Sequence, residues 1–143
     1  MRQNVGSGSP WESEVGYSRA VRVGGLVHVA GTTAMRDGVA QAPGDPYGQT
    51  RVALEIIAAA LTECGASLSD VVRTRIYVTD IAHWAEVGRA HGEVFDDVCP
   101  AATMVQVVAL ISPDLLVEIE ADAVITGPDA TERDVTGPDV TRP

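Results

Sequence analysis

Lysine is absent from this 143-residue chain, because all ten of its basic residues are arginine. No side chain can therefore form a Schiff base with a carbonyl substrate or with pyridoxal phosphate, which excludes that covalent chemistry. Twenty acidic residues outnumber the arginines and give a formal net charge of −10. Nucleic acids and anionic membranes are bound through basic patches, so we expect neither as a partner.

Cysteine is also scarce, with Cys64 and Cys99 as the only two. Two thiols are too few for a disulfide framework or a structural zinc site, and they favour a reduced, cytoplasmic setting. The histidines and acids show no metal-ligand spacing, and no glycine-rich phosphate-binding loop is present. We therefore expect no metal and no other cofactor. No apolar run approaches the ~20 residues of a membrane span.

What the chain does contain is a clear period-two alternation near its C-terminal end. Glu118, Glu120 and Asp122 share one face of an expected strand, and we call these three residues the acid row. The opposite face is apolar, with Val117, Ile119, Ala121 and Ala123. Neighbouring acids about 7 Å apart repel by roughly 2 kcal/mol at an effective dielectric near 20. The row therefore needs water, arginines or a functional pocket beside it, and a solvated face and a functional site both stay open.

The remaining pattern predicts an α+β domain with a mostly antiparallel sheet and both helices on one face. Strands are expected at 17–23, 26–30, 71–78 and from 100 onward, before the acidic strand. A helix is expected to begin after Asp45, with Pro46 in its first position, and to run to Cys64 before Gly65. A second helix over about 82–96 is expected to bury Trp84, Val87, His91 and Phe95.

The two ends of the chain differ in composition from its centre. Residues 1–14 are expected to be a mobile N-terminus, and residues 15–126 the folded domain. Residues 127–143 form an acidic tail rich in glycine and proline, which has too little apolar surface to fold alone.

Several motifs resemble the RidA/YjgF family over roughly residues 15–124. They are the run 65–74, Tyr77-Val78-Thr79-Asp80, Pro100-Ala101, and Val117-Glu118-Ile119-Glu120-Ala121. The resemblance implies a chorismate-mutase-like fold and a homotrimer with small-molecule pockets between its subunits. Members of this family hydrolyse reactive enamines and imines. An arginine clamps the substrate carboxylate, and a glutamate positions or activates the attacking water.

The resemblance also implies which residues of this chain form the pocket. Glu118 matches the water-positioning glutamate, Tyr17 matches the pocket tyrosine, and Gly31 matches a strand-end glycine that approaches the ligand. Four positions depart from the family pattern: Ala30 replaces a serine, Gly88 an asparagine, Ala102 the clamping arginine, and Met104 a cysteine. All four changes remove polarity or bulk, which predicts a more apolar or roomier pocket.

Ala102 matters most, because losing a bidentate arginine–carboxylate contact costs roughly 2–5 kcal/mol. The usual turnover of small 2-imino acids is therefore not expected from this pattern. Arg19, Arg73 and Arg75 are alternatives for a relocated clamp, or they pair with the acid row or with an interface. His28 is a candidate general base or a hydrogen-bonded structural histidine.

Two functions follow from these residues. The first is hydrolytic deamination of an enamine or imine, with Glu118 orienting the water. The second is a non-catalytic trimer that binds a ligand or protects against stress through the same pockets.

Overall fold

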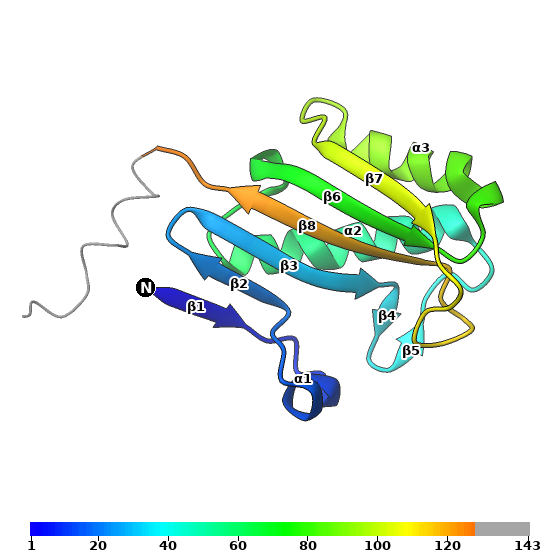
Figure 1. The fold of residues 1–143 in the computed structure, drawn as a ribbon, viewed down its shortest axis with the longest axis horizontal. Helices are drawn as coiled ribbons and strands as arrows, with labels where there is room; N and C mark the ends of the chain where they lie inside the picture. The colour runs from blue at the N-terminus through cyan, green and yellow to red at the C-terminus, as the bar shows by residue number, and fades with distance from the viewer. Residues whose placement is uncertain (128–143) are drawn as a thin grey trace, which may run out of the picture.

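The computed structural model describes residues 1–127, and a six-stranded sheet forms its centre (Figure 1). Its strands are β1 (Arg2–Val5), β2 (Ala20–Val23), β3 (Leu26–Thr33), β6 (Val71–Val78), β7 (Ala101–Gln106) and β8 (Val117–Val124). They lie in the order β1-β2-β3-β8-β6-β7, and every pair is antiparallel except β6 and β7. A small ribbon pairs β4 (Met35–Arg36) with β5 (Val39–Ala40). The α+β fold class and the largely antiparallel sheet are confirmed.

The helix α2 (Pro46–Glu63) begins where the sequence predicts. The Asp45 side chain accepts a hydrogen bond from the amide of Gly48, and Pro46 occupies the first turn, where its missing N–H is not needed. Gly65 follows the helix with a positive φ of 77°. The buried side chains of α2 pack on the sheet and include Ala53, Leu54, Ile57, Ala60 and Leu61.

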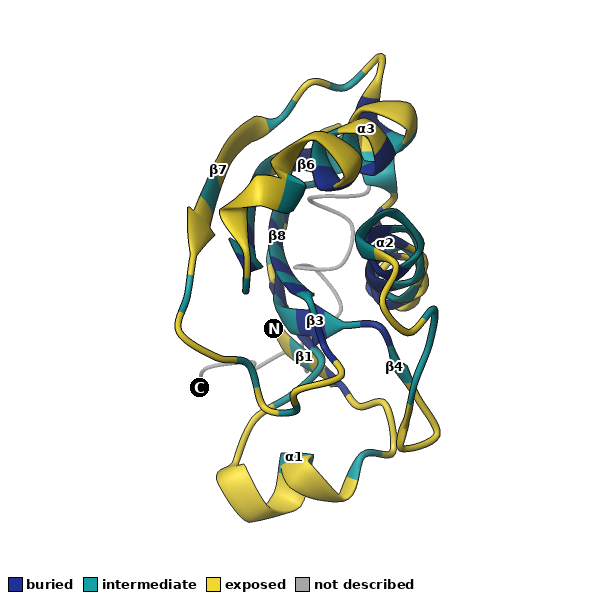
Figure 2. Cartoon of the chain, turned by 90° about the vertical axis from the view of Figure 1, so that its right-hand side faces the viewer, coloured by how far each residue is buried: buried dark blue, intermediate teal, exposed yellow. Residues whose placement is uncertain are grey.

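The helix α3 (Trp84–Phe95) follows the 3-10 turn η2 (Ile81–His83) and lies beside α2 on the same face of the sheet (Figure 2). Val87 and Phe95 are buried as expected. The expected burial of Trp84 is wrong, because its side chain is 62% exposed. Trp84 is the first residue of α3, and Ile81 in the preceding turn is exposed as well, so this end of the helix lies at the surface. No helix within residues 1–127 is long and apolar enough to cross a membrane.

The N-terminal residues contain two elements that composition does not indicate. Strand β1 pairs with β2 from Arg2↔Val23 to Val5↔Ala20, and the short helix α1 (Pro10–Val15) follows it. The Ser9 side chain caps α1, which ends at Gly16 in a left-handed conformation. The mobility expected for residues 1–14 stays a prediction, although part of this segment belongs to the sheet. Most of the predicted tail, residues 128–143, lies outside the described residues.

The alternation along β8 is confirmed, and it gives the sheet two unlike faces. The apolar residues of β8 are at most 1% exposed and lie beneath the helices: Val117, Ile119, Ala121 and Ala123. The acid row points to the opposite side, which neither α2 nor α3 covers (Figure 2). We call this side the open face. Any chemistry of the acid row is therefore placed there, away from the core.

Candidate functional site

Gly31 and Glu118 meet on the open face, where β3 and β8 pair irregularly. The register of this pair shifts between Val29 and Thr32, so Ala30 and Gly31 lie in a bulge. A Cβ atom on Gly31 would lie 2.6 Å from Oε1 of Glu118. Glycine leaves room for the carboxylate in its present position. The Glu118 side chain therefore lies directly over the backbone of the bulge.

Glu118 is the acid with the most unusual surroundings. Burial raises the pKa of its carboxyl group, Arg19 partly opposes that rise, and the charge of Glu120 adds to it. Within residues 1–127 the carboxylate of Glu118 has no hydrogen bond and no ion pair. A carboxylate that is partly desolvated and unpartnered is a stronger base than an exposed one.

Arg19 approaches the same corner from the start of β2. Its Nη2 atom donates a hydrogen bond to the carbonyl oxygen of Gly31. Its Nε atom is buried and has no hydrogen-bond partner, and its Cζ atom lies 6.0 Å from the centre of the Tyr17 ring. Burial lowers the pKa of Arg19, but a guanidinium starts so high that it keeps its charge.

A cavity of about 560 Å³ opens on the open face; Ala30, the neighbour of Gly31, lines it, whereas Gly31, Glu118 and Arg19 do not. Its lining includes Tyr17 and Ala30, two of the predicted pocket residues, together with Ser18 and His28. Asn4 of β1 also lines it and donates a 2.8 Å hydrogen bond to the hydroxyl of Ser18. The N-terminal strand thus contributes directly to the wall of the cavity, which the sequence did not predict.

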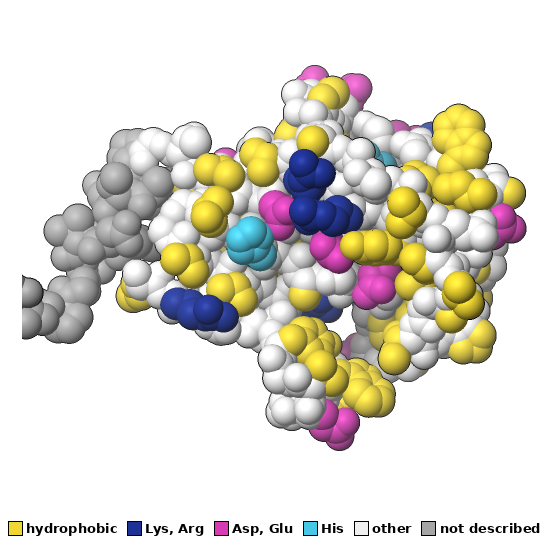
Figure 3. Space-filling view, in the orientation of Figure 1, with side chains coloured by type: hydrophobic (Ala, Val, Ile, Leu, Met, Phe, Trp, Pro, Cys, Tyr) yellow, Lys and Arg dark blue, Asp and Glu magenta, His cyan; other side chains and the backbone are white. Residues whose placement is uncertain are grey.

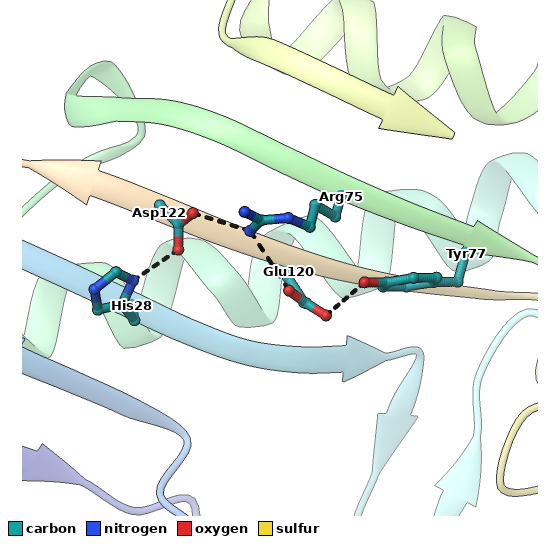
Figure 4. A network of polar contacts seen from close by, with 5 residues as sticks. All are labelled: His28, Arg75, Tyr77, Glu120 and Asp122. Carbon is teal, nitrogen blue, oxygen red and sulfur yellow. Dashed lines mark hydrogen bonds and ion pairs between the residues drawn. The ribbon is translucent and has the colours of Figure 1, made fainter. Parts of the chain in front are cut away.

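The other two acids of the row are held in a polar network (Figure 4). Nη1 of Arg75 lies 3.0 Å from Oδ2 of Asp122 and 3.7 Å from Oε2 of Glu120. The Tyr77 hydroxyl donates to Glu120 at 2.8 Å, and Nδ1 of His28 lies 2.8 Å from Oδ1 of Asp122. Burial alone would raise the pKa of Asp122, but the bonds from His28 and Arg75 hold it below its ordinary value. Arg75 and His28 are therefore partners of the acid row.

The remaining predicted pocket residues lie elsewhere in the chain. Ala102 is opposite Thr74 in the β6–β7 register, and Met104 is opposite Ile76. Thr74 and Ile76 are buried beneath the helices, so Ala102 and Met104 also point to the helix side of the sheet. Met104 packs against the core there.

Gly88 belongs to this second group of residues. It lies on α3, one turn before His91, whose Nε2 atom is 2.8 Å from the hydroxyl of Thr74. The chain therefore brings Tyr17, Ala30, Gly31 and Glu118 together on one side of the sheet. Gly88, Ala102 and Met104 lie on the other side, near the β7 edge.

Metal ligation finds no support in this arrangement. Within residues 1–127 no group of three or more histidine, cysteine or acidic side chains is placed to hold a metal ion. The structure places a base, Glu118, near a cation, Arg19, and above a glycine, Gly31. That combination can activate a water molecule beside a small bound ligand.

Comparisons with known proteins agree with this fold. A family model described as Endoribonuclease L-PSP matches residues 8–125. A crystal structure from Mycobacterium tuberculosis, of a member of the YjgF/YER057c/UK114 family, shares 57% sequence identity and a TM-score of 0.80. The alignment covers 87% of this chain and all of that one. This chain belongs to the YjgF/RidA family.

Other YjgF/RidA relatives extend the comparison. An uncharacterized protein of Streptomyces coelicolor is 42% identical over 121 residues, which are 85% of this chain and 90% of that protein. The Escherichia coli protein TdcF, solved with bound serine, shares 27% identity and a TM-score of 0.72, with coverage of 86% and 94%. The name of TdcF describes it as a proposed reactive intermediate deaminase.

Proposed function

We propose that the protein hydrolyses reactive enamines or imines to carbonyl compounds and ammonia, with Glu118 activating the water. The observation that carries this proposal is the partly buried carboxylate of Glu118 above Gly31, which has no hydrogen bond or ion pair within residues 1–127. Its neighbours Glu120 and Asp122 are already bound by other side chains, so among the described residues Glu118 is the one acid of the row without a bound side chain. The naming of TdcF as a proposed deaminase supports the same reaction class.

The reaction needs one water molecule and a base. Glu118 accepts a proton as the water oxygen forms a bond to the imine carbon, and the C=N double bond becomes a C–N single bond. The proton then passes to the nitrogen of the tetrahedral carbinolamine. Glu118 then takes the proton of the carbinolamine hydroxyl and passes it to the amino nitrogen, so that the C=O bond forms as the C–N bond breaks and ammonia leaves. An enamine enters this sequence after protonation at carbon and loss of an N–H proton give the imine.

The pocket is proposed to be completed by self-association into a homotrimer. The two groups of pocket residues lie on opposite sides of one sheet, so a single chain does not close one pocket around all of them. Leu26 and Val105 are exposed, and the strand registers place both on the open face. Figure 3 shows apolar side chains around the charged centre of this face. Analytical ultracentrifugation of the purified protein is expected to show one species with the mass of three chains. A monomer at micromolar concentration would contradict this part of the proposal.

The test of the activity is a coupled assay. A pyridoxal-phosphate dehydratase generates 2-iminobutanoate, and the release of 2-oxobutanoate is followed with and without the protein. Acceleration of this release by wild type would mean that another group replaces the arginine missing at position 102, and Glu118→Gln is then expected to lose about 100-fold or more of the rate, the usual contribution of a general base. Glu120→Gln is the matched control from the same strand face and should retain most activity. Equal rates for wild type and Glu118→Gln would overturn the assignment.

A non-catalytic ligand-binding trimer is the second candidate, and Ala102 favours it. That position offers no charge to hold a substrate carboxylate. If wild type leaves the release rate unchanged and Ala102→Arg does too, the binding function is the better one. A gain of activity in Ala102→Arg alone would show that the remaining machinery is intact.

A further inference from the structure

The cavity on the open face takes no part in the proposed hydrolysis, because neither Glu118 nor Gly31 lines it. We propose that this cavity is a second site, in which His28 transfers a proton between the enol and keto forms of a small uncharged carbonyl compound. This activity goes beyond the proposed function and does not depend on it. The group that transfers the proton is the Nε2 atom of His28.

The imidazole ring of His28 is oriented by the neighbouring strand. His28 and Asp122 lie opposite each other in the β3–β8 register, and Nδ1 of the ring is 2.8 Å from Oδ1 of the carboxylate. Nη1 of Arg75 is 3.0 Å from the other oxygen, Oδ2. The carboxylate is therefore held at both oxygens in its ionised form. Because an ionised carboxylate only accepts hydrogen bonds, Nδ1 carries the proton of the neutral ring.

This tautomer leaves a lone pair on Nε2 of His28. Within residues 1–127 Nε2 has no hydrogen bond, and in Figure 4 it points away from Asp122. The His28 side chain is 60% exposed and lines the cavity, whose volume of about 560 Å³ is typical of a small-molecule site. When Nε2 takes up a proton, the carboxylate at Nδ1 stabilises the imidazolium that forms.

The charges on the cavity wall indicate an uncharged ligand. The cations among its lining residues are Arg2 and Arg75, and the acids are Glu120 and Asp122. Two positive and two negative side chains leave this wall without net charge while His28 is neutral. A charged ligand therefore gains no net attraction from the wall that would offset the loss of its hydration.

Neutral donors and an apolar side chain complete the wall. The Tyr17 hydroxyl makes no hydrogen bond within residues 1–127, so it is available to donate to the oxygen of a ligand. The Ser18 hydroxyl accepts from Asn4 and keeps its own proton for donation. Val21, opposite His28 in the β2–β3 register, provides apolar surface for the carbon skeleton.

The reaction class follows from the number of available bases. Glu120 and Asp122 are already bound, so His28 is the one described side chain on this wall that is available to take up a proton. One group is sufficient when a proton is removed at one atom and returned at another. Because the chain contains no lysine, no side chain offers the alternative route through a Schiff base.

The proton transfer has two steps and needs no other reactant. Nε2 of His28 first takes the O–H proton of the enol, and the electrons of that bond remain on oxygen. The C=O bond then forms, and the C=C electron pair takes the proton from Nε2 to make a C–H bond. The ring returns to its neutral form, so the protein gains and loses no proton overall.

The experiment follows the enol of 2,4-pentanedione. This enol is abundant in an apolar solvent and decays toward the keto form after dilution into water, where its absorbance is recorded with and without the protein. Wild type is expected to accelerate the decay, and His28→Gln to lose about 100-fold of that acceleration. His83→Gln is the matched control and should keep it, because His83 belongs to η2 and does not line the cavity.

Asp122 is assigned as the positioning residue for His28, and its test is spectroscopic. The ¹⁵N NMR signals of His28 are expected to show the proton on Nδ1 in wild type. Asp122→Asn should give a mixture of tautomers and a slower reaction, because an amide donates as well as accepts. Glu120→Gln, which leaves the pair intact, should show the wild-type tautomer. A wild-type tautomer in Asp122→Asn would contradict this positioning role.

Two further variants separate proton transfer in the cavity from a structural role of His28. Added imidazole should restore part of the activity of His28→Ala, which a purely structural histidine would not allow. Val21→Trp, which fills the cavity opposite His28, should abolish the acceleration. Retained acceleration in Val21→Trp or in folded His28→Gln would overturn the proposal. So would a wild-type rate no greater than that of free imidazole at the same concentration, or a reaction that proceeds through a reducible adduct on the N-terminal amine.

Discussion

The two ends of the acid row place carboxylates of the same strand face in different surroundings. At one end, Glu120 and Asp122 are each bound by Arg75 and by a second side chain, and the pKa of Asp122 falls below its ordinary value. At the other end, Glu118 lies over Gly31 with no hydrogen bond or ion pair to any described residue, and burial raises its pKa. Opposite pKa shifts on one strand face separate a carboxylate kept for structure from one available for chemistry.

The largest effect on activity is expected from one methyl group added at Gly31. In Gly31→Ala the new Cβ would meet Oε1 of Glu118 at 2.6 Å, and the carboxylate must swing away because the backbone cannot. Deaminase activity should fall about 100-fold, as for other misplacements near 1 Å, while the melting temperature changes little. The coupled assay and a thermal melt measure the two effects.

Gly92→Ala is the matched control for that substitution. Gly92 is an exposed α3 residue with no atom within 4 Å of an added Cβ, so alanine should stabilise the helix by up to about 1 kcal/mol and leave activity unchanged. Retained activity in Gly31→Ala would mean that the approach of Glu118 to this glycine is not needed for the reaction.

At the other end of the row, Arg75→Gln should affect stability more than chemistry. Arg75 is 41% exposed, so solvent screens its ion pairs and the loss is expected near 1 kcal/mol. Asp122 has a lowered pKa, so its stabilising effect exists above its ordinary value of 3.8 and vanishes as the pH falls through the folded-state pKa. Denaturant titrations should therefore show a larger deficit at pH 7 than at pH 3. A deficit that is equal at both pH values would count against this network.

Smaller effects are predicted for the pH dependence, first of all for the pH dependence of activity. Glu118 acts as a base only when ionised, so kcat/KM should rise with pH through an apparent pKa above 4.5. Arg19 lowers this pKa and Glu120 raises it, so Arg19→Gln should move the rise to higher pH and Glu120→Gln to lower pH. Shifts in the same direction for both variants would contradict the assigned electrostatics.

The raised pKa of Glu118 also predicts the sign of its effect on folding. The folded state binds this proton more tightly than the unfolded chain, so the contribution of Glu118 to stability is present below pH 4.5 and is lost as the pH rises through the folded-state pKa. Glu118→Gln should remove that dependence. Equilibrium unfolding of the two proteins between pH 4 and pH 7 measures the difference.

Local signals in the sequence predicted much of this fold. The Asp45-Pro46 pair places the start of α2, and the alternation at 117–123 gives both faces of β8, because caps and strand pleats depend on adjacent residues. The surface position of Trp84 depends instead on where the first turn of α3 lies relative to the rest of the molecule. No periodicity within the helix carries that information.

The candidate site was harder to predict, because it depends on pairing between strands that are distant in the sequence. The resemblance named seven pocket residues, but the β6–β7 register is what places Ala102 and Met104 on the helix side, away from Glu118. Arg19 was one of three alternatives, and nothing in its neighbours along the chain distinguishes it from Arg73. Its place opposite Ala30 and beside the bulge comes from pairing across β2 and β3.

The separation of the two groups of pocket residues has a genetic consequence. Suppose that each pocket takes Glu118 from one chain and the β7 edge from another. A substitution at Glu118 then inactivates one half of a pocket, and a substitution on β7 inactivates the other half. Mixing a Glu118→Gln protein with one blocked by Ala102→Trp would then create some pockets built from two intact halves. Two inactive alleles in one cell would complement each other, with partial activity that neither allele gives alone.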